Sequence, residues 1–585
     1  MIDFRNINTL WSSILVETWQ RLGLNTAVIC PGSRSTPLTI AFAENLKIET
    51  IAVLDERSAA FFALGIAKKT ALPTVLICTS GTAGANFFPA IIEAKESQIP
   101  LLILTADRPS ELRQCHAGQA IDQVKLYGNY PNWQTELAIP SAEIGMLNYL
   151  RQTAIYAWEQ ALFPISGPVH LNIPFRQPLA PIFDSAIATL KSQFHPEEFL
   201  AAIEPIFPSL SNNNNTLPES VNNLIKKWQK CDRGIIIGGI AQPQLAQAYC
   251  QAIAQISQTL GWPVLAEGLS PLRNYAQLNP YLISTYDLIL RNPQIAEKLT
   301  PEIVIQIGEL PTSQNLRNWL EYTQPKRWII HLSNHNFDPL HGKTFHLRIS
   351  VENLANQILE SKLIPSKLSE YLQFWCDTEA KIRAAIDHKM ILINNLIEPK
   401  TAWLISQILP TATPLFIANS MPVRDVEIFW VPNNLNIQPF FNRGANGIDG
   451  TLSTALGIAH RHQSSVMLTG DLALLHDTNG FLLSKKLVGH LTIILINNNG
   501  GGIFEMLPIA KFDPPFEEFF ATPQNINFSQ LCATYGVEHK IIDSWEQLKQ
   551  YLNPLPSSGI RVLELPTNRR IDAQWRKDNL IINLA

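Results

Sequence analysis

The sequence predicts an α/β protein built from three doubly wound parallel-sheet domains. Apolar runs of strand length alternate with segments of helix length along most of the chain, and this alternation is typical of a parallel sheet with helices on both faces. The 585 residues provide material for about three to four domains of ordinary size. An asparagine-rich segment and a long helical segment divide the α/β pattern into three stretches.

Residues 1–190 are predicted to form the first α/β domain. Apolar residues at helical spacing predict a helix over Asn8–Leu22. The apolar runs expected to form its strands are Thr26–Cys30, Ile48–Val53, Thr74–Cys78, Leu101–Thr105 and Val169–Ile173. Residues 191–219 are expected to be a linker, because prolines and a run of asparagines at 212–215 interrupt the pattern there.

Residues 220–365 are predicted to form a central α/β domain. Its expected strands are Gly234–Ile237, Pro263–Ala266, Ile303–Ile307, Arg327–His331 and His346–Ile349. The run GIIIGGIAQP, from Gly234, is similar to a nucleotide-binding turn but lacks the full GxGxxG pattern, so a tight turn after a strand is the preferred interpretation. A helical connector over residues 366–395 and a third α/β domain over 396–585 complete the chain. Three similar α/β layers in one chain suggest duplication, although we expect no direct sequence repeat among the three domains.

Composition limits the kinds of partner. The net charge is −4 and no long basic run occurs, which argues against a nucleic-acid or lipid surface. The N-terminal segment is amphipathic and carries acids early, unlike a secretory signal, and no apolar run reaches the length of a membrane span. The seven cysteines are scattered without a CxxC pair. A reduced, cytoplasmic protein with buried thiols is therefore expected.

The stretch from Val466 to Pro508 carries the strongest functional pattern. An apolar strand ends at Gly470-Asp471, and after an amphipathic segment a second strand, Leu491–Ile496, ends in Asn497-Asn498-Asn499-Gly500-Gly501-Gly502. Parallel strands end at the same edge of a sheet, so Asp471 and Asn498 are expected to face one crevice. A carboxylate, an amide oxygen and the Gly500 carbonyl suit Mg²⁺, which completes its octahedron with phosphate oxygens and water. The alternative is a helix N-cap followed by an Asn-Gly turn.

The gap between Asp471 and Asn498 is that of one strand–helix–strand unit, and with it the pattern resembles the diphosphate-Mg²⁺ motif of thiamine diphosphate enzymes. Leu472 stands where the usual GDG form has its last glycine. The resemblance implies that Gly470 and Asp471 bind the cofactor with Asn498, and that Asp471, Asn498 and Gly500 hold the metal. The cofactors would be thiamine diphosphate and Mg²⁺, with Mn²⁺ as an alternative.

Glu56 lies at the end of a predicted strand in the first domain, where a helix begins. An acid there can simply be favourable to the helix dipole. The helix becomes apolar all round two residues later, so we expect Glu56 to enter a low-dielectric environment that raises its pKa. In the thiamine diphosphate family a glutamate hydrogen-bonded to the aminopyrimidine activates the cofactor, and the resemblance gives this catalytic role to Glu56. It also implies at least a homodimer, with each cofactor between the first domain of one subunit and the third domain of another.

Further motifs narrow the resemblance. They are Cys30–Pro37 (CPGSRSTP), Thr79–Ala83 (TSGTA), Thr105–Pro109 (TADRP), Gly118–Ile121 (GQAI), Asn419–Arg424 (NSMPVR) and Asn442–Gly450 (NRGANGIDG). Together they are similar to the 2-succinyl-5-enolpyruvyl-6-hydroxy-3-cyclohexene-1-carboxylate (SEPHCHC) synthases, the MenD family. The implied reaction decarboxylates 2-oxoglutarate and adds the succinyl carbanion equivalent to isochorismate in a Stetter-like 1,4-addition. Its product is SEPHCHC, in menaquinone or phylloquinone biosynthesis, and the enzyme would be a transferase.

The two substrates are dianions, and arginine binds carboxylates bidentately while remaining charged. The resemblance implies that one set of residues holds isochorismate or its adduct: Ser33, Arg34, Arg108, Gln119 and Arg443. Ser420 and Arg424 would hold the 2-oxoglutarate carboxylate. Gly81 would bind the cofactor, Ile448 would bend it, and Ile503, Phe504 and Leu507 would form an apolar wall over it. The alternative for each arginine is a solvated surface position, and for the apolar residues ordinary core.

One departure from the family pattern lies in the central domain. Gln314 and Asn315 stand where family members often have a basic pair, which puts a substrate contact there in doubt; Arg317 is the nearest substitute. Two other functions stay open. One is another thiamine diphosphate-dependent 2-oxo acid carboligase or decarboxylase, which the arginine set disfavours. The other is a non-catalytic α/β ligand-binding protein, which has no need of Glu56, Asp471 and Asn498 together. Dimer or tetramer is not decided.

Overall fold

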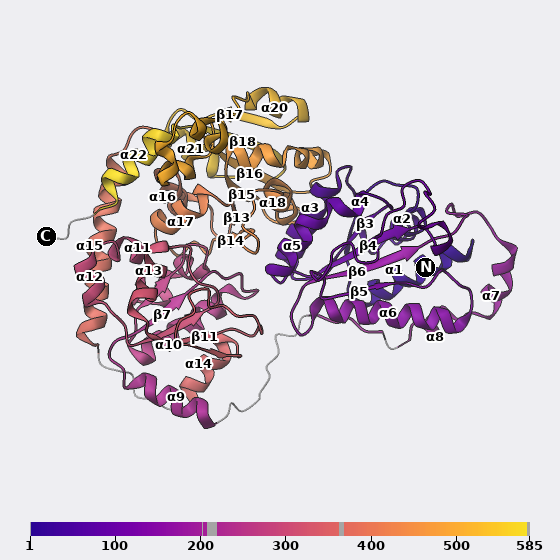
Figure 1. Cartoon of the computed structure of the whole chain (residues 1–585), viewed down its shortest axis with the longest axis horizontal. Coiled ribbons are helices and arrows are strands. Elements are labelled where there is room, and N and C mark those ends of the chain that lie inside the picture. Colours follow the sequence, from indigo (N-terminus) through magenta and orange to yellow (C-terminus); the bar gives the residue numbers. More distant parts are fainter. Residues whose placement is uncertain (1, 202, 208–218, 362–367, 582–585) are drawn as a thin grey trace. The chain divides into compact units, whose positions relative to one another are not determined.

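Three six-stranded parallel sheets organise the chain, each with helices on both faces. The computed structural model describes residues 2–201, 203–207, 219–361 and 368–581 (Figure 1). The strand orders are β2-β1-β3-β4-β6-β5 in the first sheet, β12-β11-β10-β7-β8-β9 in the middle sheet and β14-β13-β15-β16-β18-β17 in the third. Neighbouring strands pair in parallel. The predicted fold class is confirmed.

The four inner strands of the first sheet, β1, β3, β4 and β6, are apolar runs buried on both faces, as a parallel sheet requires. Its strands are β1 (Thr26–Ile29), β2 (Glu49–Ala52), β3 (Thr74–Cys78), β4 (Leu101–Asp107), β5 (Trp133–Glu136) and β6 (Pro168–Pro174). Strand β5 was not predicted. Its sequence WQTE is polar and only half-buried, because β5 lies at the edge of the sheet.

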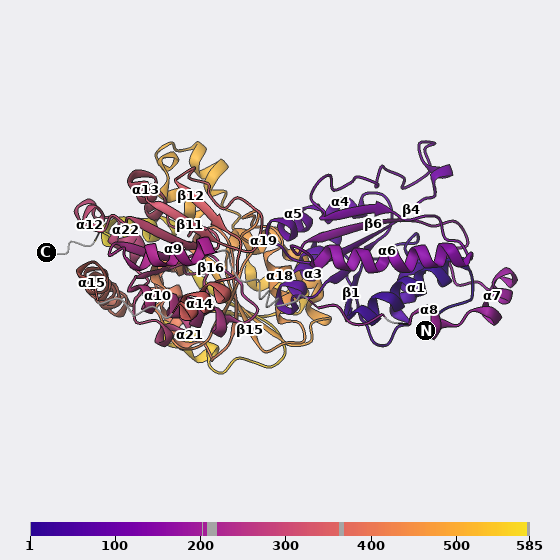
Figure 2. The ribbon, with the colours of Figure 1, turned by 90° about the horizontal axis from the view of Figure 1, so that it is seen from below.

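Helices cover both faces of the first sheet. They are α1 (Ile7–Leu22), α2 (Thr36–Ala43), α3 (Glu56–Thr70), α4 (Ala83–Asn86), α5 (Phe88–Glu96), α6 (Ile144–Leu162), α7 (Ala188–Gln193) and α8 (Pro196–Phe199). The predicted helix over Asn8–Leu22 corresponds to α1, which Asn6 caps by accepting the N–H of Thr9. Helices α1 and α6 lie side by side and share one apolar core with the sheet (Figure 2).

The middle sheet has the strand order of a dinucleotide-binding fold. Its strands are β7 (Gly234–Gly238), β8 (Val264–Ala266), β9 (Leu282–Ile283), β10 (Ile303–Ile307), β11 (Lys326–Ile330) and β12 (Thr344–Leu347). Its helices are α9 (Glu219–Gln229), α10 (Ala246–Leu260), α11 (Tyr286–Ile289), α12 (Pro293–Lys298), α13 (Gln314–Thr323) and α14 (Val351–Glu360). After β7, a Cβ on Gly239 would lie 1.7 Å from the Glu309 carbonyl oxygen, so this turn is packed against chain, as expected for a structural turn.

The third sheet contains the Gly470-Asp471 and Asn498 segments. Its strands are β13 (Pro414–Ile417), β14 (Gln438–Phe440), β15 (Ser465–Gly470), β16 (His490–Asn497), β17 (Glu538–Ile541) and β18 (Gly559–Pro566). The helices from the connector onward are α15 (Glu370–Leu392), α16 (Glu398–Ile408), α17 (Met421–Phe429), α18 (Thr451–Ala459), α19 (Asp471–His476), α20 (Phe528–Tyr535), α21 (Trp545–Leu552) and α22 (Arg569–Asn579). Helix α15 lies within the predicted helical connector.

The first and third sheets have the same topology. When strands are numbered in chain order within each domain, both sheets read 2-1-3-4-6-5, whereas the middle sheet reads 6-5-4-1-2-3. The expectation of no direct repeat is wrong, because the pentapeptide ALGIA occurs at Ala63–Ala67 in α3 and at Ala455–Ala459 in α18. Both helices follow the second strand of their domain. The shared order and the repeat at matching positions support duplication of the first and third domains.

The described chain divides into two compact units. One contains the first sheet together with Asn442–His462 and Leu474–His490; the other contains the middle and third sheets. The domain boundaries derived from the sequence stay a prediction. Residues 202 and 208–218 of the predicted linker, residues 362–365 of the predicted central domain and residues 366–367 of the predicted connector lie outside the described residues. Among the helices that are described, none has the length and apolarity needed to cross a membrane.

Candidate active site

In the first sheet, the predicted site residues follow four neighbouring strands. Arg34 follows β1, Glu56 follows β2, Gly81 follows β3 and Arg108 follows β4, and the sheet order β2-β1-β3-β4 makes these strands adjacent. The carboxyl ends of parallel strands open on one edge, where α/β proteins bind ligands. The fold therefore gathers these residues along one edge of the first sheet.

Two arginines lie close together at this edge. Arg108 donates through Nη1 to Ser80 Oγ and, at 3.1 Å, to the Gln119 carbonyl oxygen. Arg34 donates through Nη1 to the Phe175 carbonyl at 2.8 Å, and its buried Nε has no hydrogen-bond partner. Burial lowers the pKa of Arg34, and the charge of Arg108 lowers it further. Two nearby cations with an unused buried N–H form a suitable site for an anionic ligand.

Gly81 and Gln119 belong to the same edge. Gly81 has φ +85°, and a Cβ there would contact Gln119 at 3.4 Å. The Gly81 N–H donates to Gln123 Oε1 at 2.9 Å, which fixes the turn. Gln119 is exposed and also has positive φ, at 56°. Ser33 is exposed next to Arg34.

Glu56 is the first residue of α3. The preceding residue, Asp55, caps the helix by accepting the Ser58 N–H at 2.9 Å and also accepts from Asn479 Nδ2 at 2.7 Å. The helix is buried continuously from Ser58 to Ala67, as expected, but Glu56 itself is only half-buried. The expectation of a low-dielectric environment is not met within one chain, because Glu56 and Arg57, the first two residues of the helix, are only half-buried.

In the third sheet, Asp471 and the Asn498 loop lie next to each other at the ends of adjacent strands β15 and β16. Asp471 is 5 % exposed; its Oδ1 accepts the Leu472 N–H and its Oδ2 accepts the Gly500 N–H, both at 2.8 Å. Burial raises the pKa of Asp471 to about 6, although these N–H groups oppose the shift. The Gly500 carbonyl accepts the Gly502 N–H at 2.9 Å and keeps a second lone pair.

The side-chain amide of Asn498 has a defined orientation. Its Nδ2 donates to Glu398 Oε1, and a carboxylate accepting from Arg576 can only face the NH₂ end of the amide. Oδ1 of Asn498 is therefore turned away from Glu398, and it is buried without a hydrogen-bond partner. A buried amide oxygen without a donor costs free energy unless a cation or water satisfies it. The oxygen donors of Asp471 and Asn498 thus fit a hard cation.

Glycines make room for this loop. Gly500 has φ +138°, and a Cβ there would lie 2.3 Å from the Ala521 carbonyl oxygen. A Cβ on Gly502 would lie 2.7 Å from Asn498 Nδ2. Gly470 has no atom within 4 Å of a Cβ position, so space is open beside the end of β15. Gly500 and Gly502 are therefore required by close packing of the loop, and the open space beside Gly470 is suited to a diphosphate.

Ser420 and Arg424 follow β13 in the same sheet. Ser420 has φ 74° and ψ −125°, a strained backbone for a residue with a side chain. Its carbonyl accepts from Arg424 Nη1 at 2.7 Å across the first turn of α17. Strain that a surrounding structure maintains is often found at ligand sites.

The loop that carries Arg443 and Ile448 belongs to the first compact unit. Buried Glu93 of α5 accepts the Gly444 N–H at 3.1 Å and the Ala445 N–H at 2.7 Å. Arg443 and Ile448 are half-buried. A cavity of about 140 Å³ lies beside this loop; it is lined by Phe61, Pro89, Ile92, Glu93, Asn442, Ala445, Gly447 and Asp449.

The predicted apolar wall follows the glycine run. Ile503 and Phe504 are half-buried, and Leu507 is 47 % exposed. Phe504 packs edge-on against Phe520, with ring centroids 5.8 Å apart. These residues are available at a surface rather than enclosed in the core.

In the central domain, the side chains at the departure from the family pattern are already hydrogen-bonded within the protein. Gln314 donates to Asn318 at 2.7 Å, and Asn315 donates to Asp287 at 3.1 Å. Arg317 donates to the carbonyls of Pro311 and Leu310.

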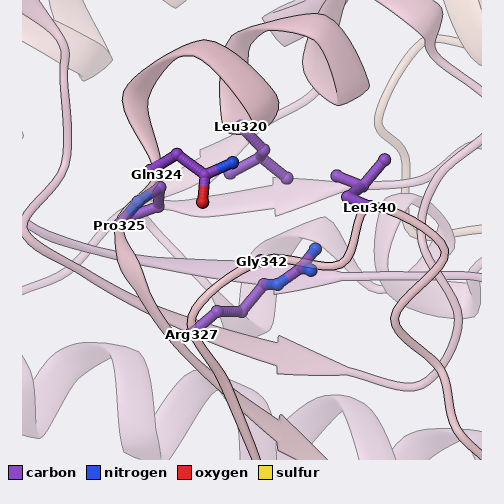
Figure 3. A pocket seen from close by; sticks show the side chains of 6 residues that line it. All are labelled: Leu320, Gln324, Pro325, Arg327, Leu340 and Gly342. Carbon is purple, nitrogen blue, oxygen red and sulfur yellow. The ribbon is translucent and has the colours of Figure 1, made fainter.

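A small cavity of this domain, about 10 Å³, has room for a single water. Its lining comes from the end of α13, the start of β11 and the following loop (Figure 3): Leu320, Gln324, Pro325, Arg327, Leu340 and Gly342. No predicted site residue lines it.

Several residues next to the site were missed. Glu398, Asp425 and Arg576 form a buried ion network beside Asn498, and Glu93 holds the Arg443 loop. Glu398 and Asn498 are separated by 100 residues. No local pattern in the sequence connects them.

Comparison with known proteins identifies the family. Residues 11–126 match the family model described as thiamine pyrophosphate enzyme, N-terminal TPP binding domain, and residues 208–417 match the one described as middle domain of thiamine pyrophosphate. The chain is 68% identical over 579 residues to the SEPHCHC synthase of Trichodesmium erythraeum and 67% identical over 580 residues to that of Gloeothece citriformis, with 99% of each chain covered in both cases. The chain belongs to the SEPHCHC synthase family. It is a thiamine diphosphate-dependent enzyme.

Solved structures with the same fold include the benzoylformate decarboxylase of Polynucleobacter necessarius. The TM-score is 0.69 at 15% identity, over 96% of this chain and 98% of that one. This likeness supports the three-sheet fold, and membership of the SEPHCHC synthase family rests on the sequence relatives.

Proposed function

We propose that the chain is the SEPHCHC synthase that its relatives are named for: it converts 2-oxoglutarate and isochorismate into SEPHCHC and CO₂, with thiamine diphosphate and Mg²⁺. The observation that carries the proposal is the identity of 68% to a SEPHCHC synthase over 99% of both chains. The reaction belongs to menaquinone or phylloquinone biosynthesis.

The metal is the first part of the proposal. Asp471, Asn498 and the Gly500 carbonyl would bind Mg²⁺, or alternatively Mn²⁺, and the metal would bind the diphosphate. The unpartnered Asn498 Oδ1 supports this assignment. The open space beside Gly470 would accommodate the phosphates.

When bound, thiamine diphosphate supplies the electron sink for loss of CO₂ and for carbon–carbon bond formation. Glu56 would hold a proton at the aminopyrimidine, near Gly81. Ile448, Ile503 and Phe504 would exclude water from the thiazolium side. A second subunit would cover the half-exposed Glu56, so a homodimer or homotetramer with its active sites between subunits is part of the proposal, as is a cytoplasmic location.

The arginines would provide substrate specificity. Arg34 and Arg108, with Ser33, Gln119 and Arg443, would bind the carboxylates of isochorismate, and Ser420 with Arg424 would bind the remote carboxylate of 2-oxoglutarate. The paired cations of Arg34 and Arg108 favour a dianionic acceptor over the small neutral acceptors of other carboligases.

A paired assay tests the proposal. The enzyme with thiamine diphosphate and Mg²⁺ receives 2-oxoglutarate, with and without isochorismate, and both CO₂ release and isochorismate loss are followed. We expect joint consumption that EDTA abolishes and Mg²⁺ restores. CO₂ release indifferent to isochorismate would indicate a different acceptor, and no reaction with either substrate would refute the proposed function.

A further inference from the structure

Helix α22 contacts three separate segments of the candidate site in the third domain. Arg569 at its start donates through Nη1 to the Asn499 carbonyl at 2.8 Å and pairs with Glu505 at 3.1 Å and with Glu517. Asn499 adjoins the proposed metal ligand Asn498, and Glu505 lies between Phe504 and Leu507 of the proposed wall. One end of α22 therefore holds the loop on both sides of the glycine run.

Arg576, two turns further along α22, lies in a buried ion network. It is 4 % exposed and donates through Nη2 to Glu398 Oε2 at 2.9 Å and to both carboxylate oxygens of Asp425, at 2.7 and 2.8 Å. Asp572 of the same helix accepts the Glu398 N–H at 3.4 Å. Charge-assisted bonds in a buried site have strict geometry, so they fix the groups that make them.

Each of the two carboxylates held by Arg576 leads to a different part of the site. Glu398 accepts from Asn498 Nδ2 and so determines that the amide presents Oδ1, not Nδ2, to the proposed metal. Asp425 follows Arg424 on α17, the helix that the strained Ser420 directly precedes. One guanidinium thus joins the proposed metal loop to the proposed 2-oxoglutarate helix.

A purely structural role would not require charge at this position. Burying an arginine among several carboxylates is costly, and well-packed apolar side chains often stabilise a core as well or better. The network instead provides orientation, which a metal ligand needs: partners that orient ligands typically affect metal affinity by about 10–100-fold.

We infer that α22 is a positioning element of the active site, in which Arg576 orients the metal ligand Asn498 through Glu398 and the donor-substrate helix α17 through Asp425. The inference rests on the proposed function for the identity of the two ligands. Glu398, Asp425 and Arg576 are positioning residues and touch neither substrate nor cofactor in this scheme.

Three conservative variants distinguish the proposed effect on Asn498, which acts through Glu398, from the proposed effect on α17, which acts through Asp425. In Glu398→Gln the Mg²⁺ concentration needed for half-maximal thiamine diphosphate binding should rise about 10–100-fold, and saturating Mg²⁺ should restore kcat. In Asp425→Asn the KM for 2-oxoglutarate should rise about tenfold with the Mg²⁺ requirement little changed. Arg576→Lys should show both effects, because lysine lacks the planar fork.

Cofactor binding is measured by titration calorimetry at several Mg²⁺ concentrations, independently of turnover. The matched control is Arg561→Lys: Arg561 is 6 % exposed in the same domain and donates to Thr492 and Tyr551, away from the loop and from α17. Its thermal stability should fall as in Arg576→Lys, while its Mg²⁺ requirement and KM stay at the wild-type values.

Wild-type Mg²⁺ requirement and KM in folded Arg576→Lys would overturn the inference, and so would equal changes in the Arg561→Lys control. If Arg576→Lys does not fold, Glu398→Gln and Asp425→Asn decide in the same way. A wild-type chain that binds no thiamine diphosphate with Mg²⁺ would instead refute the proposed function, so the two failures are distinguishable.

Discussion

The first and third sheets have one topology and different chemistry at the same strand ends. In the first sheet, the positions after the first four strands bring together Arg34, Glu56, Gly81 and Arg108. In the third sheet, the matching positions hold Ser420 and Arg424, Arg443, Asp471 and Asn498. A shared fold thus provides equivalent strand ends, and the residue types at those ends determine what each sheet can bind.

The middle sheet extends this comparison. It has the strand order typical of dinucleotide binding, yet its first turn is packed against Glu309, and a cavity near β11 has room for only a single water. A favourable topology alone therefore does not make a ligand site at this turn. The variants below test whether residues of the first sheet act in proton transfer and acceptor binding, and whether residues of the third sheet bind the metal and cofactor, as proposed.

The largest effect is expected at Glu56. Glu56→Gln should lower kcat by about 10²–10⁴-fold with thiamine diphosphate affinity unchanged, because the amide cannot transfer the proton. Steady-state rates and calorimetry measure the two quantities. Glu44→Gln, an exposed change in the same domain, is the control, and a variant at Glu56 with wild-type kcat would remove the first sheet from the chemistry.

Asp471 tests the oxygen site of the third sheet. Asp471→Ala should weaken Mg²⁺-dependent thiamine diphosphate binding by about 100-fold, because a charged metal ligand and the acceptor for the Gly500 N–H are lost together. Titration calorimetry with and without Mg²⁺ measures the thiamine diphosphate affinity. The exposed change Asp543→Ala is the control. Unchanged affinity would refute the metal assignment.

Arg108 tests the cationic edge of the first sheet. Arg108→Ala should raise the KM for isochorismate by about 10–100-fold and leave cofactor affinity unchanged, because one charge-assisted carboxylate contact is lost. Initial rates at varied isochorismate measure the change. Arg21→Ala, an ion-paired arginine of α1 in the same domain, should leave KM unaltered. If CO₂ release without isochorismate fell equally, the acceptor-binding role would be wrong.

A smaller effect concerns the repeated helices α3 and α18. A Cβ on Gly457 would lie 2.2 Å from the Phe62 carbonyl oxygen, and one on Gly65 would lie 2.1 Å from the Thr454 carbonyl. Gly457→Ala should therefore destabilise the chain by about 1–3 kcal/mol in thermal unfolding. Gly145→Ala in α6, where nothing lies within 4 Å, should be neutral or stabilising. Equal thermal unfolding midpoints for the two variants would show that the contact between α3 and α18 tolerates an added side chain.

The sequence predicted elements whose signal is local. Buried strands such as β3 and β16 have continuous apolar runs, so their positions were predicted closely. The edge strand β17 reads EHKI and β5 reads WQTE, and a polar edge has no such run. The burial expected for Glu56 was not found, because apolar residues on a helix do not indicate what covers its first turn.

Among the site residues, too, those in local motifs were found from the sequence and those from distant segments were not. Motifs adjacent in the chain located Asp471, Asn498 and the arginines, and their roles stay predictions. The partners that orient them come from distant segments: Glu398 lies 178 residues from Arg576, and Asp425 lies 151 residues from it. The hydrophobic pattern of one sequence carries information only on residues within a few helical turns of each other, so these contacts could not be predicted.

The bracing of the Asn498 loop by α22 also affects the order of assembly. Contacts between segments so distant in the chain form late in folding, because closing a long loop costs conformational entropy. We therefore expect a refolding chain to regain helical circular dichroism before it regains Mg²⁺-dependent thiamine diphosphate binding; simultaneous recovery of both signals would contradict this. During synthesis α22 leaves the ribosome after every segment that it contacts here, so a nascent chain would stay inactive until α22 docks.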